Sequence, residues 1–260
     1  MLSVSQIENQ TMTVGHSSPE QRILQNLNSL KSNGRFIQKG NIEWHRIGFQ
    51  IDGLINFNPA QGWLMRGVWH SLMGNTQDIH SSIRNVYRLT RSVPVLLDVI
   101  GIYTSHGMPS AATQVYAYAA NPAHGDLLKA LPYAVATGSL QQTVEYLDKA
   151  RELGMDMAGS HELIQKIRVA ARMLDAHGIS DDVLARHLDL AGEVMREDQR
   201  FQSLPNLHLP AGSPESFLIE YTVDCGPDEA AAFNQSLSGK EKAAGILKSP
   251  VYNIIFTAGR

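Results

Sequence analysis

The stretch SFLIEYTVDC, at residues 216–225, decides the fold class because apolar and polar side chains alternate along it. Phe, Ile, Tyr, Val and Cys occupy its odd-numbered positions, whereas Glu220, Thr222 and Asp224 lie between them. A period of two predicts a β-strand with one buried face. A second strand is predicted at 251–258, VYNIIFTA, after a stretch with helical patterning. The order strand, helix, strand needs a crossover connection, so we expect two parallel strands in one sheet.

A β-hairpin is predicted nearer the N-terminus. IEWHRIGFQI at 42–51 and LINF at 54–57 are separated by Asp52-Gly53. This dipeptide favours a type I′ turn, because both of its residues tolerate a positive φ. We expect the hairpin to join the same sheet as the C-terminal strands.

The long middle of the chain, from about 62 to 203, has helical periodicity. One helix is expected to run from Ser160 to His177, with Gly178 beyond its end. The prediction is therefore an α+β fold. It has a predominantly α-helical body and a small mixed β-sheet built from the N-terminal hairpin and the C-terminal strands.

Four segments follow from these patterns. Residues 1–17 are expected to be a flexible polar terminus, and 18–203 the hairpin plus the helical bundle. Residues 204–215 contain three prolines and predict a linker. Residues 216–260 form the C-terminal β-α-β segment, which we expect to complete the same domain.

Composition excludes several classes of protein. The chain has 260 residues, of which 43% are hydrophobic and 18% charged, with a formal net charge of −3. This balance is globular and gives no basic field for dedicated nucleic-acid or anionic-membrane binding. The longest apolar run, at 93–103, is too short for a membrane span and contains Asp98. With a single cysteine, neither an intramolecular disulfide nor a thiolate metal cluster can form within one chain. A cytoplasmic location is expected.

The first 21 residues contain no Lys or Arg and are rich in Ser, Thr, Asn and Gln. They lack the basic and apolar regions of a signal peptide. Their composition resembles the N-terminal export segment of bacterial type III secretion substrates. That resemblance implies secretion by a route independent of a signal peptide. The alternative is a polar terminus with no targeting role.

Arg172 and His177 match the Arg-x4-His spacing of HEPN-type ribonucleases, which they resemble in this respect alone. The resemblance implies a catalytic pair. However, five residues correspond to about 140° of helical rotation, so the two side chains would project from different faces. We therefore favour an ordinary helix end, where a histidine also suits the helix dipole.

Cys225 is a second catalytic candidate, because it ends a predicted strand and precedes Gly226-Pro227-Asp228-Glu229 at a helix start. A helix N-terminus can lower a thiol pKa and create a nucleophile for a hydrolase or transferase. The strand alternation instead turns Cys225 toward the core, and the two acidic residues oppose a thiolate. An inert buried cysteine is the alternative.

No metal or cofactor site is predicted. The ten histidines include no pair at the i, i+3 or i, i+4 spacing that metal-binding helices use. The phosphate-binding and dinucleotide-binding glycine motifs and the hydrolase nucleophile motif are missing from the sequence.

Aromatic and basic residues gather in two nearby stretches. Trp44 lies in the first, and Trp63, Arg66, Trp69 and His70 lie in the second. Spacings of three residues would put Trp, Arg and Trp on one helical face, suited to cation–π contact. We expect this face to bind a partner protein, the alternative being core tryptophans around a structural arginine.

The leading hypothesis is a soluble protein-interaction or regulatory protein. A bacterial origin, secretion as an effector and formation of a homo-oligomer belong to this hypothesis. The alternative is an enzyme that uses Cys225, or a helical ribonuclease that uses Arg172 and His177. The sequence leaves open whether the protein is an enzyme.

Overall fold

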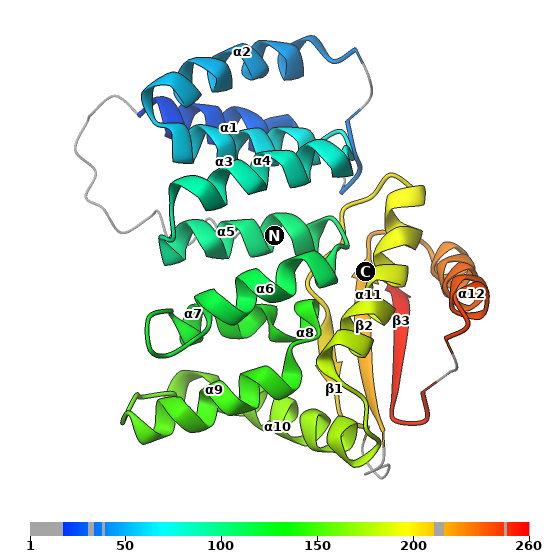
Figure 1. Ribbon diagram of the computed structural model, residues 1–260. Coiled ribbons are helices and arrows are strands. Elements are labelled where there is room, and N and C mark those ends of the chain that lie inside the picture. Colours follow the sequence, from blue (N-terminus) through cyan, green and yellow to red (C-terminus); the bar gives the residue numbers. More distant parts are fainter. Residues whose placement is uncertain (1–17, 31–33, 38–39, 211–215, 247–248, 260) are drawn as a thin grey trace. The chain divides into compact units, whose positions relative to one another are not determined.

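The computed structural model describes residues 18–30, 34–37, 40–210, 216–246 and 249–259 (Figure 1). The predicted terminus at 1–17 lies outside these residues. The fold class is confirmed, because the chain is predominantly helical and carries a small mixed sheet of three strands. The chain divides into two compact units, residues 1–102 and 103–260.

Unit 1 is helical throughout its regular elements. Its helices are α1 (Pro19–Leu30), α2 (Ile42–Phe57), α3 (Pro59–Ser71), α4 (Thr76–Leu89) and the larger part of α5 (Val93–Ser105). Helix α3 packs closely against both α2 and α4. Helices α2 and α3 carry every residue predicted to bind a partner.

The predicted N-terminal hairpin is wrong, because residues 42–57 form the single helix α2. Its buried residues are Ile47, Gly48, Ile51 and Leu54, a spacing that lies on one face of a helix. The Asn41 side chain caps the helix by accepting a hydrogen bond from the Trp44 main-chain nitrogen. The Asp52-Gly53 pair is thus helix interior, and tertiary burial overrides the cost of the glycine.

Close packing between α2 and α3 depends on one glycine. A Cβ atom at Gly62 would lie 2.6 Å from the Ile55 main-chain N and Cα atoms. Main-chain atoms cannot move aside as a flexible side chain can. Glycine at this position therefore lets the two helices approach, and it fixes how α2 is presented.

Unit 2 combines helices with the sheet. Its helices are α6 (Pro109–Ala119), α7 (Leu127–Ala130), α8 (Ala134–Thr137), α9 (Leu140–Glu152), α10 (His161–Ala176), α11 (Asp181–Glu197) and α12 (Pro227–Ala243), with 3₁₀ turns η2 (Leu131–Tyr133) and η3 (Ala158–Ser160). The helix predicted from Ser160 to His177 is confirmed as α10, and both residues flank it as caps.

The sheet contains β1 (Asn206–His208), β2 (Phe217–Val223) and β3 (Tyr252–Ala258), in the order β1-β2-β3. Strands β2 and β3 are parallel and are connected through α12, as predicted, whereas β1 is antiparallel to β2. Residues 206–208 were expected to lie in a linker. They instead form an edge strand whose Leu207 is buried between two exposed neighbours.

The alternation along β2 produces the burial that the sequence predicts. Its odd-numbered residues Phe217, Ile219, Tyr221 and Val223 are buried, and the residues between them are half-buried or exposed. Helix α12 packs on β3, and α11 packs on α12. This arrangement brings side chains from α11, α12 and β3 together.

Candidate functional site

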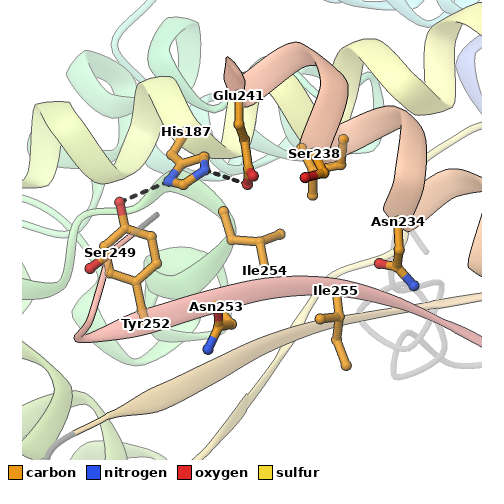
Figure 2. Close-up of a pocket in the computed structure, with 10 residues that line it drawn as sticks. His187, Asn234, Ser238, Glu241, Ser249, Tyr252, Asn253, Ile254 and Ile255 are labelled. Atoms are coloured by element: carbon orange, nitrogen blue, oxygen red, sulfur yellow. Dashed lines mark hydrogen bonds and ion pairs between the residues drawn. The ribbon is translucent and has the colours of Figure 1, made fainter. Parts of the chain in front are cut away.

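A cavity of about 170 Å³ lies where α11, α12 and β3 meet in unit 2 (Figure 2). Its lining residues are His187, Asn234, Leu237, Ser238, Glu241, Ser249, Tyr252, Asn253, Ile254 and Ile255. The volume is below the range of roughly 300–1,000 Å³ that is typical of drug-sized ligand pockets. The cavity therefore suits a small group or part of a larger molecule.

His187 is the centre of a hydrogen-bonded cluster at one end of this cavity. Its Nδ1 lies 3.0 Å from the Tyr252 hydroxyl, and its Nε2 lies 2.7 Å from Glu241 Oε1. A carboxylate accepts only, so we assign a proton to Nε2 that is donated to Glu241. The Tyr252 hydroxyl then donates to Nδ1, and both ring nitrogens have partners.

Burial controls the chemistry of the cluster. The side chains of His187 and Glu241 are only 5% and 12% exposed. Burial, assisted by the nearby Glu241 carboxylate, raises the pKa of Tyr252 to about 12. Tyr252 therefore stays a protonated donor near neutral pH. A carboxylate, an imidazole and a hydroxyl in this order could relay a proton. Here, however, the hydroxyl is the phenol of Tyr252, which is held inside the fold.

Sequence reasoning missed this cluster because its members are far apart in the chain. Glu241 lies 54 residues after His187, and Tyr252 lies 65 residues after it. No local spacing connects them. The one available signal was a histidine on the apolar face of the helix 181–197, beside Leu184 and Leu188.

Cys225 lies just beyond β2 and just before α12, as the sequence predicts. It is half-buried, and no hydrogen bond from a described residue reaches its thiol. Burial and the Glu229 carboxylate raise the pKa of Cys225, while Arg200 acts in the opposite direction. A raised pKa disfavours the thiolate. Catalysis by Cys225 stays a prediction.

Arg172 and His177 are both exposed near the end of α10. Arg172 Nε donates to the Arg168 main-chain oxygen, and His177 Nδ1 lies 3.0 Å from the Met173 main-chain oxygen. Each side chain thus interacts with its own helix. In the described part of the chain, no hydrogen bond joins Arg172 to His177, so the ribonuclease role stays a prediction.

Trp44 on α2 and Trp69 on α3 stack on each other, with ring centroids 3.8 Å apart and planes 9° apart. Each indole also donates to the other's main chain. Trp44 Nε1 reaches the Trp69 oxygen at 3.1 Å, and Trp69 Nε1 reaches the Trp44 oxygen at 2.8 Å. The two polar ends of the pair are therefore used within unit 1.

Arg66 lies between two aromatic rings, with its guanidinium carbon 5.7 Å from the centroids of both Trp63 and Trp69. This is the geometry that the three-residue spacing predicts. Arg66 also forms an ion pair with Asp52 of α2, and burial lowers the pKa of its guanidinium. His70 follows on α3, with its ring centroid 4.7 Å from that of Trp69.

The outer face of α2 exposes three large apolar side chains. Ile42 is 79% exposed, Phe49 77% and Phe57 84%. At 100° per residue these positions lie within an arc of about 80°. We call these three residues the α2 outer face. Sequence analysis missed it because it assigned these residues to a hairpin.

Within the described ranges, no group of three metal-ligating side chains is placed to hold a metal ion. No helix in the described part of the chain is long and apolar enough to cross a membrane. The chain matches no protein-family model, no curated protein and no solved structure. Function must therefore be argued from the sites themselves.

Proposed function

We propose that this is a protein-interaction protein whose α2 outer face docks an amphipathic helix of a partner protein. The exposure of Ile42, Phe49 and Phe57 carries the proposal. Two phenylalanines can each bury about 150–250 Å² of surface. Large apolar side chains left exposed along one helix face are typical of an interaction site.

The spacing of the face favours a helical partner. Phe49 follows Ile42 by seven residues and Phe57 follows Phe49 by eight, so the stripe extends for about 22 Å along α2. Partner helices bind such stripes through their own i, i+3, i+4 and i+7 side chains. Gly53 lies between the two phenylalanines, and a Cβ there would meet no atom within 4 Å. This leaves a notch for a side chain of the incoming helix.

The charged side chains on and beside the face have partners on α2 and α3, and Arg46 itself lies within the arc, between Ile42 and Phe49. Arg46 pairs with Glu43 on the same helix at 2.7 Å, and Asp52 pairs with Arg66. These charges are balanced within unit 1 and can form the polar rim of an interface. An apolar helix face therefore fits here better than a highly charged partner.

The contacts between α2 and α3 support the same proposal, because they hold α2 in place. The stacked Trp44–Trp69 pair and the Arg66–Asp52 ion pair join α2 to α3. Trp63, Arg66, Trp69, His70 and Trp44 were predicted to touch the partner directly. We now assign them mainly to the orientation of α2, because all five are half-buried.

Photo-crosslinking tests the proposal at the residue that carries it. A benzoylphenylalanine at position 49 should crosslink in cells to a segment with amphipathic helical patterning in another protein. The Phe49→Glu variant should lose that partner in affinity capture. Leu153→Glu should retain it, because Leu153 is also exposed but lies in unit 2. A crosslink only to a second copy, or equal capture by both variants, would contradict a helical partner.

The location of the protein remains a separate proposal. A secreted bacterial effector is supported by the first 21 residues, which contain no Lys or Arg. Fusing these residues to a cytoplasmic reporter in a type III secretion strain should export the reporter. Retention of the reporter would instead support a cytoplasmic interaction or regulatory protein.

A further inference from the structure

Among the residues that the structure describes, no strand covers the outer edge of β3, because the sheet order is β1-β2-β3. The Phe217 main-chain nitrogen donates to the Val251 oxygen, and the Gly259 nitrogen donates to the Val223 oxygen. The main-chain groups of odd-numbered β3 residues therefore point to β2. Those of Tyr252, Ile254 and Phe256 must point to the free edge, since direction alternates along a strand.

Asn234 of α12 already occupies one position on this edge. Its Nδ2 donates to the Phe256 main-chain oxygen at 2.8 Å, and its Oδ1 accepts from the Phe256 nitrogen at 2.8 Å. A carboxamide has the same donor and acceptor pair as a peptide group. The edge is thus built to pair with an amide at Phe256, and the side chain of Asn234 supplies it.

Within the described part of the chain, the two preceding outward positions have no such partner. Tyr252 is 3% exposed and Ile254 is 8% exposed, yet no hydrogen bond from a described residue reaches their outward main-chain groups. Buried main-chain groups are nearly always paired with protein or water, because an unpaired one costs about 1–3 kcal/mol. A peptide group beside this edge would supply the missing partners.

The cavity lies at the edge of β3. Figure 2 shows the Ile254 side chain directed toward His187 and Glu241, while Asn253 and Ile255 point the other way. All three residues nevertheless line the same cavity, as does Tyr252. A cavity over one face of a strand would contact only alternate residues. Contact with four consecutive residues means that this one reaches around the free edge.

We propose that the free edge of β3 binds an extended peptide segment as an added strand, through the main chains of Tyr252 and Ile254. Addition of a strand to a sheet edge with unpaired main-chain groups is an established way to bind a peptide. A cavity this small holds the paired backbone, and the rest of the segment continues outside it.

The negative charge of Glu241 indicates which side chain the bound segment should carry. The Oε1 atom of Glu241 bonds His187, and no hydrogen bond or ion pair from a described residue reaches its Oε2 atom. A Lys or Arg side chain of the segment can reach this oxygen from the added strand. The inference goes beyond the proposed function, because it concerns unit 2 and recognition through the main chain.

The first test uses three synthetic probes and amide NMR on the full chain. Acetyl-Val-Lys-Val-Lys-Val-amide should shift the amide signals of Tyr252 and Ile254. Two matched peptides carry N-methyl groups on either the valine or the lysine nitrogens. Only one of these two sets faces β3, so one methylated peptide should bind at least about tenfold more weakly and the other within about threefold. No shift at Ile254 with millimolar peptide, or equal binding of all three, would overturn the proposal.

A pair of variants tests the same register from the protein. Ile254→Pro removes a nitrogen–hydrogen group that faces the cavity, and it should abolish peptide binding while the sheet remains. Proline is tolerated at such outward positions of edge strands. If that variant fails to fold, the methylated peptides still decide the matter.

Glu241→Gln should weaken binding of the lysine peptide about threefold relative to binding of a glutamine-containing peptide. Equal affinities would remove Glu241 from the site.

Discussion

The α2 outer face and the free edge of β3 offer a partner two different kinds of surface. The first presents the side chains of Ile42, Phe49 and Phe57 to solvent. The second presents main-chain groups of Tyr252 and Ile254, whose side chains are buried. A partner of α2 is selected by shape and apolar contact, whereas a partner of β3 is selected first by its extended backbone.

This difference determines which mutations should matter. Side-chain truncation should damage the helix face, because a few buried aromatic anchors carry most of the energy of such interfaces. The strand edge should tolerate truncation and should respond to changes that remove a main-chain donor.

Phe49→Ala should weaken binding of the α2 partner by about 30-fold or more, as expected for a central aromatic anchor. Asn253→Ala should change peptide affinity at β3 by less than about threefold, because that exposed side chain makes no main-chain pair at the free edge. Isothermal titration with each ligand measures both values. Comparable losses of affinity in the two variants would contradict the difference between the helix face and the strand edge.

Asn234→Ala should lower the free energy of unfolding by about 1–3 kcal/mol, because it leaves the main-chain groups of buried Phe256 unpaired. Gln235→Ala is the matched control. It replaces the next residue of α12, which is exposed, and should change stability by less than about 0.5 kcal/mol. Urea denaturation compares the two. Similar losses would mean that Asn234 does not support the edge.

Tyr252→Phe should cost about 0.5–1.5 kcal/mol of stability, because it removes the hydroxyl that bonds His187. The edge should still bind the valine–lysine peptide, since its main chain is unchanged. Tyr118→Phe provides the control, because Tyr118 is exposed. A loss of peptide binding in Tyr252→Phe would show that the side-chain cluster, rather than the main chain, forms the site.

His70 gives the smallest effect, a pH dependence in unit 1. Burial lowers the pKa of His70 from its usual 6.5, and Asp78 only partly opposes this. The unfolded chain therefore takes up a proton at a higher pH than the folded chain does. Stability should fall as the pH drops below 6.5 and should level off below the folded pKa.

His70→Gln should flatten that slope, since glutamine does not titrate. Denaturant melts between pH 7.5 and 5 would detect the difference. An unchanged slope would mean that another group controls the pH dependence of unit 1.

The sequence predicted β2 and β3 because their burial is one-sided and follows a period of two. It failed at 42–57, where the apolar residues fit either a strand pair or one face of a helix. The Asp52-Gly53 pair favoured a turn locally. The deciding contact is tertiary, because Gly62 allows the main chain of Ile55 to approach and α2 is buried on α3.

The sites follow the same rule. The contact of Arg66 with Trp63 and Trp69 was predicted, because three-residue spacing on one helix fixes it. The contact of His187 with Glu241 was not predicted, because the two residues lie on α11 and α12, which β1 and β2 separate along the chain. Residues within one element can be paired from spacing. Residues on different elements need the packing itself.

The most direct test of the central claim is amide hydrogen exchange along β3 in the full chain without any ligand. The account predicts slow exchange at Asn253 and Ile255, which donate to β2, and at Phe256, which donates to Asn234. It predicts faster exchange at Ile254, and protection there when the valine–lysine peptide is added. Equal protection of Ile254 and its neighbours in the free protein would contradict an open edge.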